Sequence, residues 1–62
     1  MTTAAATVLV VHDSEGTRLV FADWLRRAGY IVLEAASGEE ALAQLTRTGI
    51  DLALIDVGRR GR

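Results

Sequence analysis

The 62-residue chain contains no cysteine and no proline, and it has only one phenylalanine, one tyrosine and one tryptophan. The absence of cysteine excludes disulfides and thiolate metal sites. A domain of this length buries only about 60% of its unfolded surface, so without such crosslinks its stability must come from packing or from a partner. Lysine is absent too, and the seven positively charged side chains are all arginine. This excludes any chemistry that needs a lysine of this chain.

The chain also lacks an apolar run long enough to span a bilayer, and residues 1–7 carry no basic cluster typical of a secretion signal. These absences predict a cytoplasmic protein. The net charge is only −1, but three of the seven arginines lie in residues 59–62, Arg-Arg-Gly-Arg, behind an acidic body. Such a basic end is most often a solvated tail. Nucleic-acid binding is the weaker alternative, because an acidic body repels phosphates.

Three strand-like and two helix-like segments alternate along the chain. The β-branched run at residues 8–11 predicts a strand buried on both faces, and residues 30–35 alternate as an edge strand does. Residues 51–57 carry a second apolar run that ends on a carboxylate. The order βαβαβ predicts parallel strands joined by right-handed crossovers, with two strand orders open.

The first helix is predicted to begin after Ser14 or Asp13 as N-cap and to end before Gly29 in the left-handed C′ position. Apolar residues at three- and four-residue spacings predict its buried face and place both of its aromatic residues in the core. These residues are Leu19, Val20, Phe21, Trp24, Leu25 and Ala28.

The second helix is predicted from a capping-box spacing, because Ser37 precedes Glu40 by three residues. The helix is expected to end near Gly49. Its apolar stripe comprises Ala41, Leu42 and Leu45.

Two carboxylates follow the predicted first and third strands. If the first strand is central, giving the order 2-1-3, its end lies about 4.8 Å from the end of the third strand. Asp13 and Asp56 then meet at the edge where open parallel sheets bind ligands. The plainer interpretation is that both simply end strands, with Asp13 capping the helix. We expect His12 to be a partly exposed structural residue, since adjacent strand residues point to opposite faces.

Residues 7 to 58 resemble the response-regulator receiver family, the chemotaxis-type phosphoacceptor domains. The resemblance rests on the acidic residue after the first strand and on the segments RRAGY, EAASGEEAL and DLALIDV in that order. It implies the N-terminal half of a doubly wound, flavodoxin-like α/β fold with sheet order 2-1-3. The predicted organisation is a disordered tail at 1–6, a half-receiver domain at 7–58 and a basic tail at 59–62.

The resemblance further implies that Asp56 accepts a phosphoryl group from a histidine kinase, and that Asp13, Asp56 and the main chain of Gly58 bind Mg²⁺. His12 stands where the family has a carboxylate, which should weaken Mg²⁺ and favour a softer divalent ion. The hydroxyl and lysine residues that contact the phosphoryl group in receivers have no counterpart in this sequence. We therefore expect a signalling module that is not an enzyme and not competent for phosphotransfer alone. The alternative is a phosphoacceptor that another chain complements.

The third strand is expected to drive self-association. Residues Leu52 to Ile55 are apolar on both faces, as in an interior strand, and in a complete receiver a fourth strand pairs with the third. An unpaired apolar edge is a template for another chain. Because twofold symmetry is the commonest closed arrangement, we predict a homodimer with an antiparallel junction at this strand.

Overall fold

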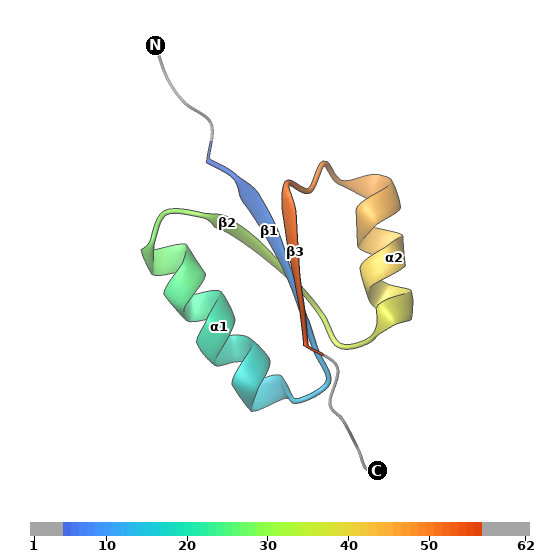
Figure 1. Ribbon diagram of the computed structural model, residues 1–62, viewed down its shortest axis with the longest axis horizontal. Coiled ribbons are helices and arrows are strands. Elements are labelled where there is room, and N and C mark those ends of the chain that lie inside the picture. Colours follow the sequence, from blue (N-terminus) through green and yellow to red (C-terminus); the bar gives the residue numbers. More distant parts are fainter. Residues whose placement is uncertain (1–4, 57–62) are drawn as a thin grey trace.

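The computed structural model describes residues 5–56, with only the backbone at Asp56 (Figure 1). The three strands form one parallel sheet in the order β2-β1-β3, which confirms the α/β class and the 2-1-3 order. The elements in chain order are β1 (Thr7–His12), α1 (Glu15–Arg27), β2 (Ile31–Ala35), α2 (Gly38–Arg47) and β3 (Leu52–Asp56).

The core lies on the two faces of β1, the central strand, which Figure 1 shows between the two helices. Side chains alternate along a strand, so Val8 and Val10 pack with Ala22 of α1, and Leu9 and Val11 pack on the face of α2. All four of these β1 residues are buried, as predicted for a strand covered on both sides.

The N-cap of α1 is Ser14, whose Oγ accepts a hydrogen bond from the Thr17 N–H at 3.4 Å. Asp13 is therefore not the cap, and its carboxylate is not used by the start of the helix. At the other end, Gly29 has a φ of 102°, the left-handed conformation predicted for it.

The start of α2 is a capping box, as predicted. Ser37 Oγ accepts from the Glu40 N–H at 3.2 Å, and Glu40 Oε1 accepts in return from the Ala36 N–H at 3.0 Å. The return bond thus reaches one residue further upstream than in the usual box. The helix ends at Arg47 with Thr48 as C-cap, close to the predicted end.

The predicted apolar faces of the helices are buried less than expected. Trp24 is 63% exposed, so its assignment to the core is wrong, and the fully buried residue of α1 is the small Ala22. Both helices pack only on β1 and β2. Because two strands form a narrow surface, they cover only a narrow part of each helix. The other predicted core residues that are exposed are Leu19, Val20, Ala28, Leu42 and Leu45.

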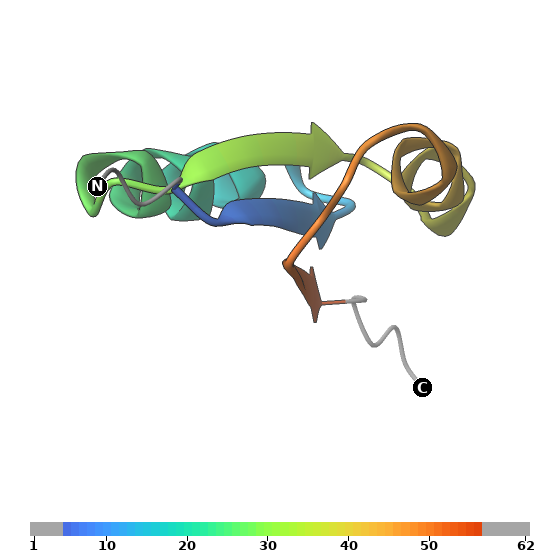
Figure 2. The same cartoon turned by 90° about the horizontal axis from the view of Figure 1, so that it is seen from above.

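Strand β3 stands apart from both helices (Figure 2). Asp51, directly before β3, is held to the start of β1, because the Asp51 N–H donates to Thr7 O at 2.9 Å and the Thr7 N–H donates to Asp51 Oδ2 at 2.8 Å. In the part of the chain described, neither helix has the length and apolarity that crossing a membrane requires.

Candidate functional site

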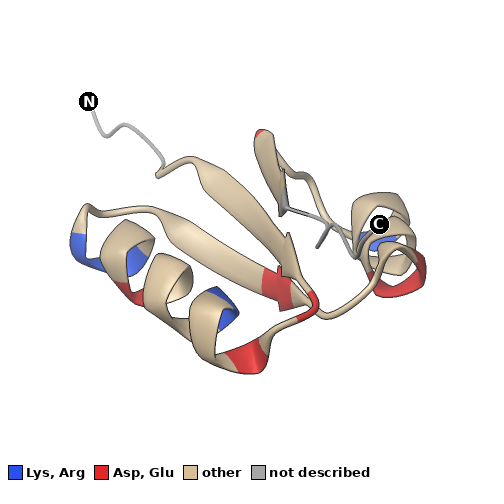
Figure 3. Cartoon of the chain, turned by 60° about the horizontal axis from the view of Figure 1, so that its bottom comes forward, with Lys and Arg blue, Asp and Glu red and all other residues tan. Residues whose placement is uncertain are grey.

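The candidate site lies at the C-terminal edge of the sheet, where β1 and β3 end side by side. The register pairs Val11 with Ile55 and His12 with Asp56, so the backbone of Asp56 lies next to the end of β1. Asp13 is the next residue along the chain. Figure 3 shows acidic segments at this end of the sheet and at the start of α1. The predicted proximity of the two strand ends is therefore confirmed.

His12 is held in place by its neighbours. Its Nδ1 accepts a hydrogen bond from the Ser14 N–H at 3.0 Å, and its ring lies 6.5 Å from the ring of Phe21, measured between centroids. The His12 side chain is 13% exposed. These contacts agree with the structural role predicted for it.

The Asp13 carboxylate is 56% exposed, and its Oδ1 lies 3.4 Å from His12 Nδ1. Strand alternation predicts that these neighbouring side chains diverge. Asp13 lies beyond the last residue of β1, however, where the backbone bends and the alternation no longer applies. The bend therefore places the Asp13 carboxylate beside the His12 imidazole at the sheet edge, although Nδ1 of His12 already accepts from the Ser14 N–H.

The predicted metal site is described in part. Asp56 is described only by its backbone, and Gly58 and the basic residues 59–62 lie outside the described residues. Among the side chains that are described, no three of His, Asp or Glu gather into a group that could hold a metal ion. What the described part offers is one carboxylate, Asp13, beside one imidazole, His12. That donor pair would suit a transition-metal ion better than Mg²⁺, which prefers oxygen ligands, but Nδ1 of His12 would first have to give up the bond that it accepts from the Ser14 N–H.

A small apolar pocket adjoins His12 on the face of α1. Its volume is about 100 Å³, and Phe21 and Leu54 close it from α1 and β3. The remaining lining residues are Val10 and Val11. The imidazole of His12 therefore has an apolar side as well as a side that meets Asp13.

A cluster of charges that sequence reasoning missed lies beside the site. Glu34 lies on β2, which was predicted only as an alternating edge strand, and its carboxylate lies 3.3 Å from Arg18 Nε and 3.3 Å from Arg26 Nη2. Arg18 also donates from Nη1 to His12 O at 2.9 Å, so the cluster is linked to the end of β1. The signal in the sequence is the two arginines, two turns apart, on a helix that otherwise packs apolar residues against the sheet.

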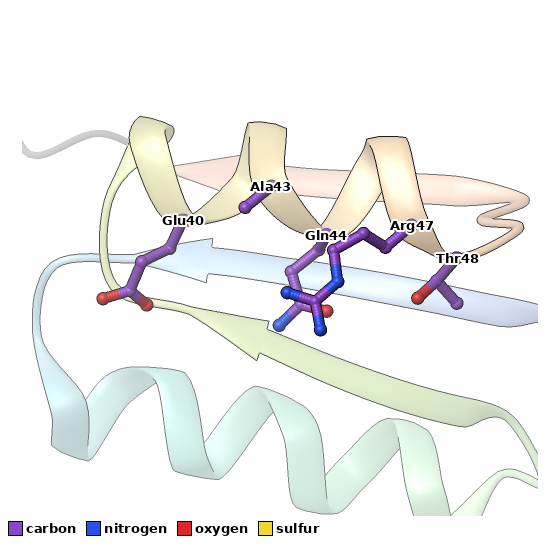
Figure 4. A pocket seen from close by; sticks show the side chains of 5 residues that line it. All are labelled: Glu40, Ala43, Gln44, Arg47 and Thr48. Carbon is purple, nitrogen blue, oxygen red and sulfur yellow. The ribbon is translucent and has the colours of Figure 1, made fainter.

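A second, more polar groove runs along α2 (Figure 4). In this view the side chain of Gln44 extends from the helix toward β2, and that of Glu40 lies beside the loop that follows the strand. The groove is also lined by Ala43, Arg47 and Thr48.

Comparison with known proteins finds one family. Residues 8–58 match the response regulator receiver domain. A cyclic di-GMP phosphodiesterase of Thermotoga maritima is 41% identical over 51 residues, which are 82% of this chain and 13% of that protein. A protein-glutamate methylesterase/protein-glutamine glutaminase 2 of Caulobacter vibrioides is 37% identical over 51 residues, 81% of this chain and 15% of that protein.

The transcriptional regulatory protein YrkP of Bacillus subtilis is 42% identical over 50 residues, 81% of this chain and 21% of that protein. The chain thus spans less than a quarter of the length of each of these relatives. No solved structure gives a significant match.

Proposed function

Because the chain belongs to the response regulator receiver family, we propose that it is a signalling module whose sheet is completed through β3 by a second copy of the same chain. The activities named for its relatives are those of proteins several times longer than this chain.

The observation that carries the proposal is the exposure of β3 on both faces. Leu52 is 60% exposed, Leu54 41% and Ile55 58%, although the three form an apolar run of the kind found inside sheets. Covering such a strand removes apolar surface from water, at about 25 cal/mol per Å². Pairing β3 with its own copy also satisfies backbone groups along the outer side of the strand. Because the two β3 strands run antiparallel, the two Asp56 residues lie at opposite ends of the strands in the joined sheet.

Sedimentation equilibrium tests this proposal at micromolar protein. The expected result is a species of twice the 6.7 kDa chain mass, with a dissociation to monomer on dilution. A folded monomer that melts sharply and keeps the single-chain mass would overturn it.

The proposal includes an Asp56 that does not take part in phosphotransfer when the chain is alone. Phosphoryl transfer depends on positioned positive charge around the phosphoryl oxygens. The chain has no lysine to provide it, and His12 replaces one oxygen donor at the edge with nitrogen. A divalent ion held at Asp13 would neutralise part of the phosphoryl charge, but one carboxylate and one imidazole hold Mg²⁺ weakly.

A second candidate function is that of a phosphoacceptor complemented by another chain, with a histidine kinase as the donor. The register favours it, because His12 pairs with Asp56 and brings the end of β3 beside the turn that carries Asp13. Incubation with acetyl phosphate and Mg²⁺, followed by intact-mass measurement, tests the premise that both candidate functions share, namely that the chain alone is not competent. We expect no increase in the mass of the chain when it is incubated alone. A gain of one phosphoryl group that Asp56→Asn removes would show that the chain is competent without a partner.

A further inference from the structure

The outer edge of β2 is occupied by side chains. The Ile31 N–H donates to Ala6 O at 2.9 Å, so the backbone groups of Ile31 face β1. Because these groups alternate along a strand, those of Val32 and Glu34 face away from β1, toward the outer edge. An outer edge of this kind would ordinarily be able to pair with another strand.

Each of these two outward carbonyls accepts a hydrogen bond from a different helix. Arg26 of α1 donates from Nη2 to Val32 O at 3.1 Å, and Gln44 of α2 donates from Nε2 to Glu34 O at 3.4 Å. Directly after the strand, Glu40 Oε1 accepts from the Ala36 N–H at 3.0 Å. Figure 4 shows Gln44 extending toward β2 and Glu40 lying beside the loop that follows the strand.

Arg26 makes a second contact at this edge. Its Nη2 also lies 3.3 Å from Glu34 Oε2, and the same carboxylate contacts Arg18. An incoming strand would have to displace Arg26 from both Val32 O and Glu34, and would leave a charged group in the way of the new ladder. Each hydrogen bond given up counts against pairing, and charge at an edge disfavours it further.

We propose that Arg26 and Gln44, with Glu40 at the strand end, close the β2 edge, so that another chain can extend the sheet only along β3. This inference rests on the proposed self-association through β3. If β3 pairs two copies and the β2 edge of each copy is closed, the assembly stops at two copies. The two outer edges of the joined six-stranded sheet are then both β2 edges, and neither accepts a further copy.

The test is the double variant Arg26→Met/Gln44→Met, which removes both donors and keeps helix-favouring side chains of similar length. The matched control is Arg27→Met/Thr46→Met, which makes the same charge change and adds the same apolar side chains at exposed positions of α1 and α2. Sedimentation velocity over a range of protein concentrations compares both with the unmodified chain. We expect the double variant to form species larger than a dimer, in amounts that rise with concentration, and the control to match the unmodified chain.

A double variant that sediments like the unmodified chain, or a control that associates as strongly as the double variant, would overturn the closed edge. The single variant Gln44→Met keeps the Arg26–Glu34 contact, so it should also form species larger than a dimer, but in smaller amounts. It keeps the test decisive if the double variant misfolds. The stoichiometry of the unmodified chain decides separately on self-association through β3. If that chain is monomeric, the proposed dimer fails, while the difference between double variant and control still decides whether the β2 edge is closed.

Discussion

Strands β2 and β3 hold equivalent places in the sheet but very different surroundings. Both pair with β1 along one edge only, yet β2 is packed on both faces, with Val32 toward α1 and Ala35 toward α2. Its outer carbonyls are engaged by helix side chains. On β3 the larger apolar residues are exposed on both faces, and neither helix packs on the strand. An outer position in a sheet therefore does not decide whether a strand is protected; the helices beside it do.

The largest effect is expected from making β3 unable to pair. Leu54→Lys places a charge on the middle of the strand in each copy, where the dimer would have to bury it. We expect dimerisation to weaken at least tenfold, about 1.4 kcal/mol, or the chain to unfold. Sedimentation equilibrium measures the effect. Leu42→Lys is the control, because it adds the same charge at an exposed position of α2; equal effects of the two variants would mean that β3 is not the junction.

The protection of β2 can be broken at Glu34. Glu34→Ala leaves Arg18 and Arg26 without their shared carboxylate, and the loss is costly for Arg18, whose contact with Glu34 is partly buried, whereas the contact of Arg26 is exposed. We expect the free energy of unfolding to fall by about 1–2 kcal/mol in urea titrations at a fixed protein concentration.

Glu39→Ala removes the same charge from an exposed position in the first turn of α2, and should cost less than about 0.5 kcal/mol. If both glutamate variants lose the same stability, the cluster at Glu34 contributes nothing beyond its charge.

Metal binding probes the edge that β1 and β3 share. If Nδ1 of His12 gives up its bond from the Ser14 N–H and binds one ion together with Asp13, Mn²⁺ should raise the melting temperature more than Mg²⁺ does. At a concentration ten times its Kd, a ligand specific for the folded state adds about 1.4 kcal/mol. Calorimetric melting of the chain and of Asp13→Asn would measure this. An equal shift with Asp13→Asn, or a larger shift with Mg²⁺, would contradict a site built from these two residues.

The smallest effect is expected at the cap of α2, the helix that contributes Gln44 to the β2 edge. Ser37→Ala removes the oxygen that accepts from the Glu40 N–H and should cost about 1 kcal/mol of stability. Thr46→Ala, at an exposed position of the same helix, should change stability by less than about 0.5 kcal/mol. An unchanged denaturation midpoint and slope for Ser37→Ala would show that the cap does not stabilise the helix.

Local patterns predicted most of the fold. The apolar run of β1, the Ser37–Glu40 spacing and the glycine at position 29 each depend on interactions within a few residues, and the structure has each as expected. The exposure of Trp24 could not be predicted in this way, because helical periodicity identifies an apolar face but not the width of the layer against which it packs.

The candidate site was predicted less completely for a related reason. The meeting of the β1 and β3 ends follows from strand order, but the contact of His12 with Asp13 depends on a backbone bend beyond the strand. The place of Glu34 between two arginines depends on the rotation of α1 over β2, which no local pattern in the sequence specifies. Sequence reasoning thus located the edge of the sheet better than it located the side chains there.

Amide hydrogen exchange at increasing protein concentration tests the contrast between the two outer strands most directly. Our account predicts that amides within residues 52–55 of β3 become more protected as dimers form, while the outward-facing amides of Val32 and Glu34 in β2 exchange at an unchanged rate. Protection that rises with concentration at Val32 and Glu34 instead, or at neither strand of a folded chain, would contradict it.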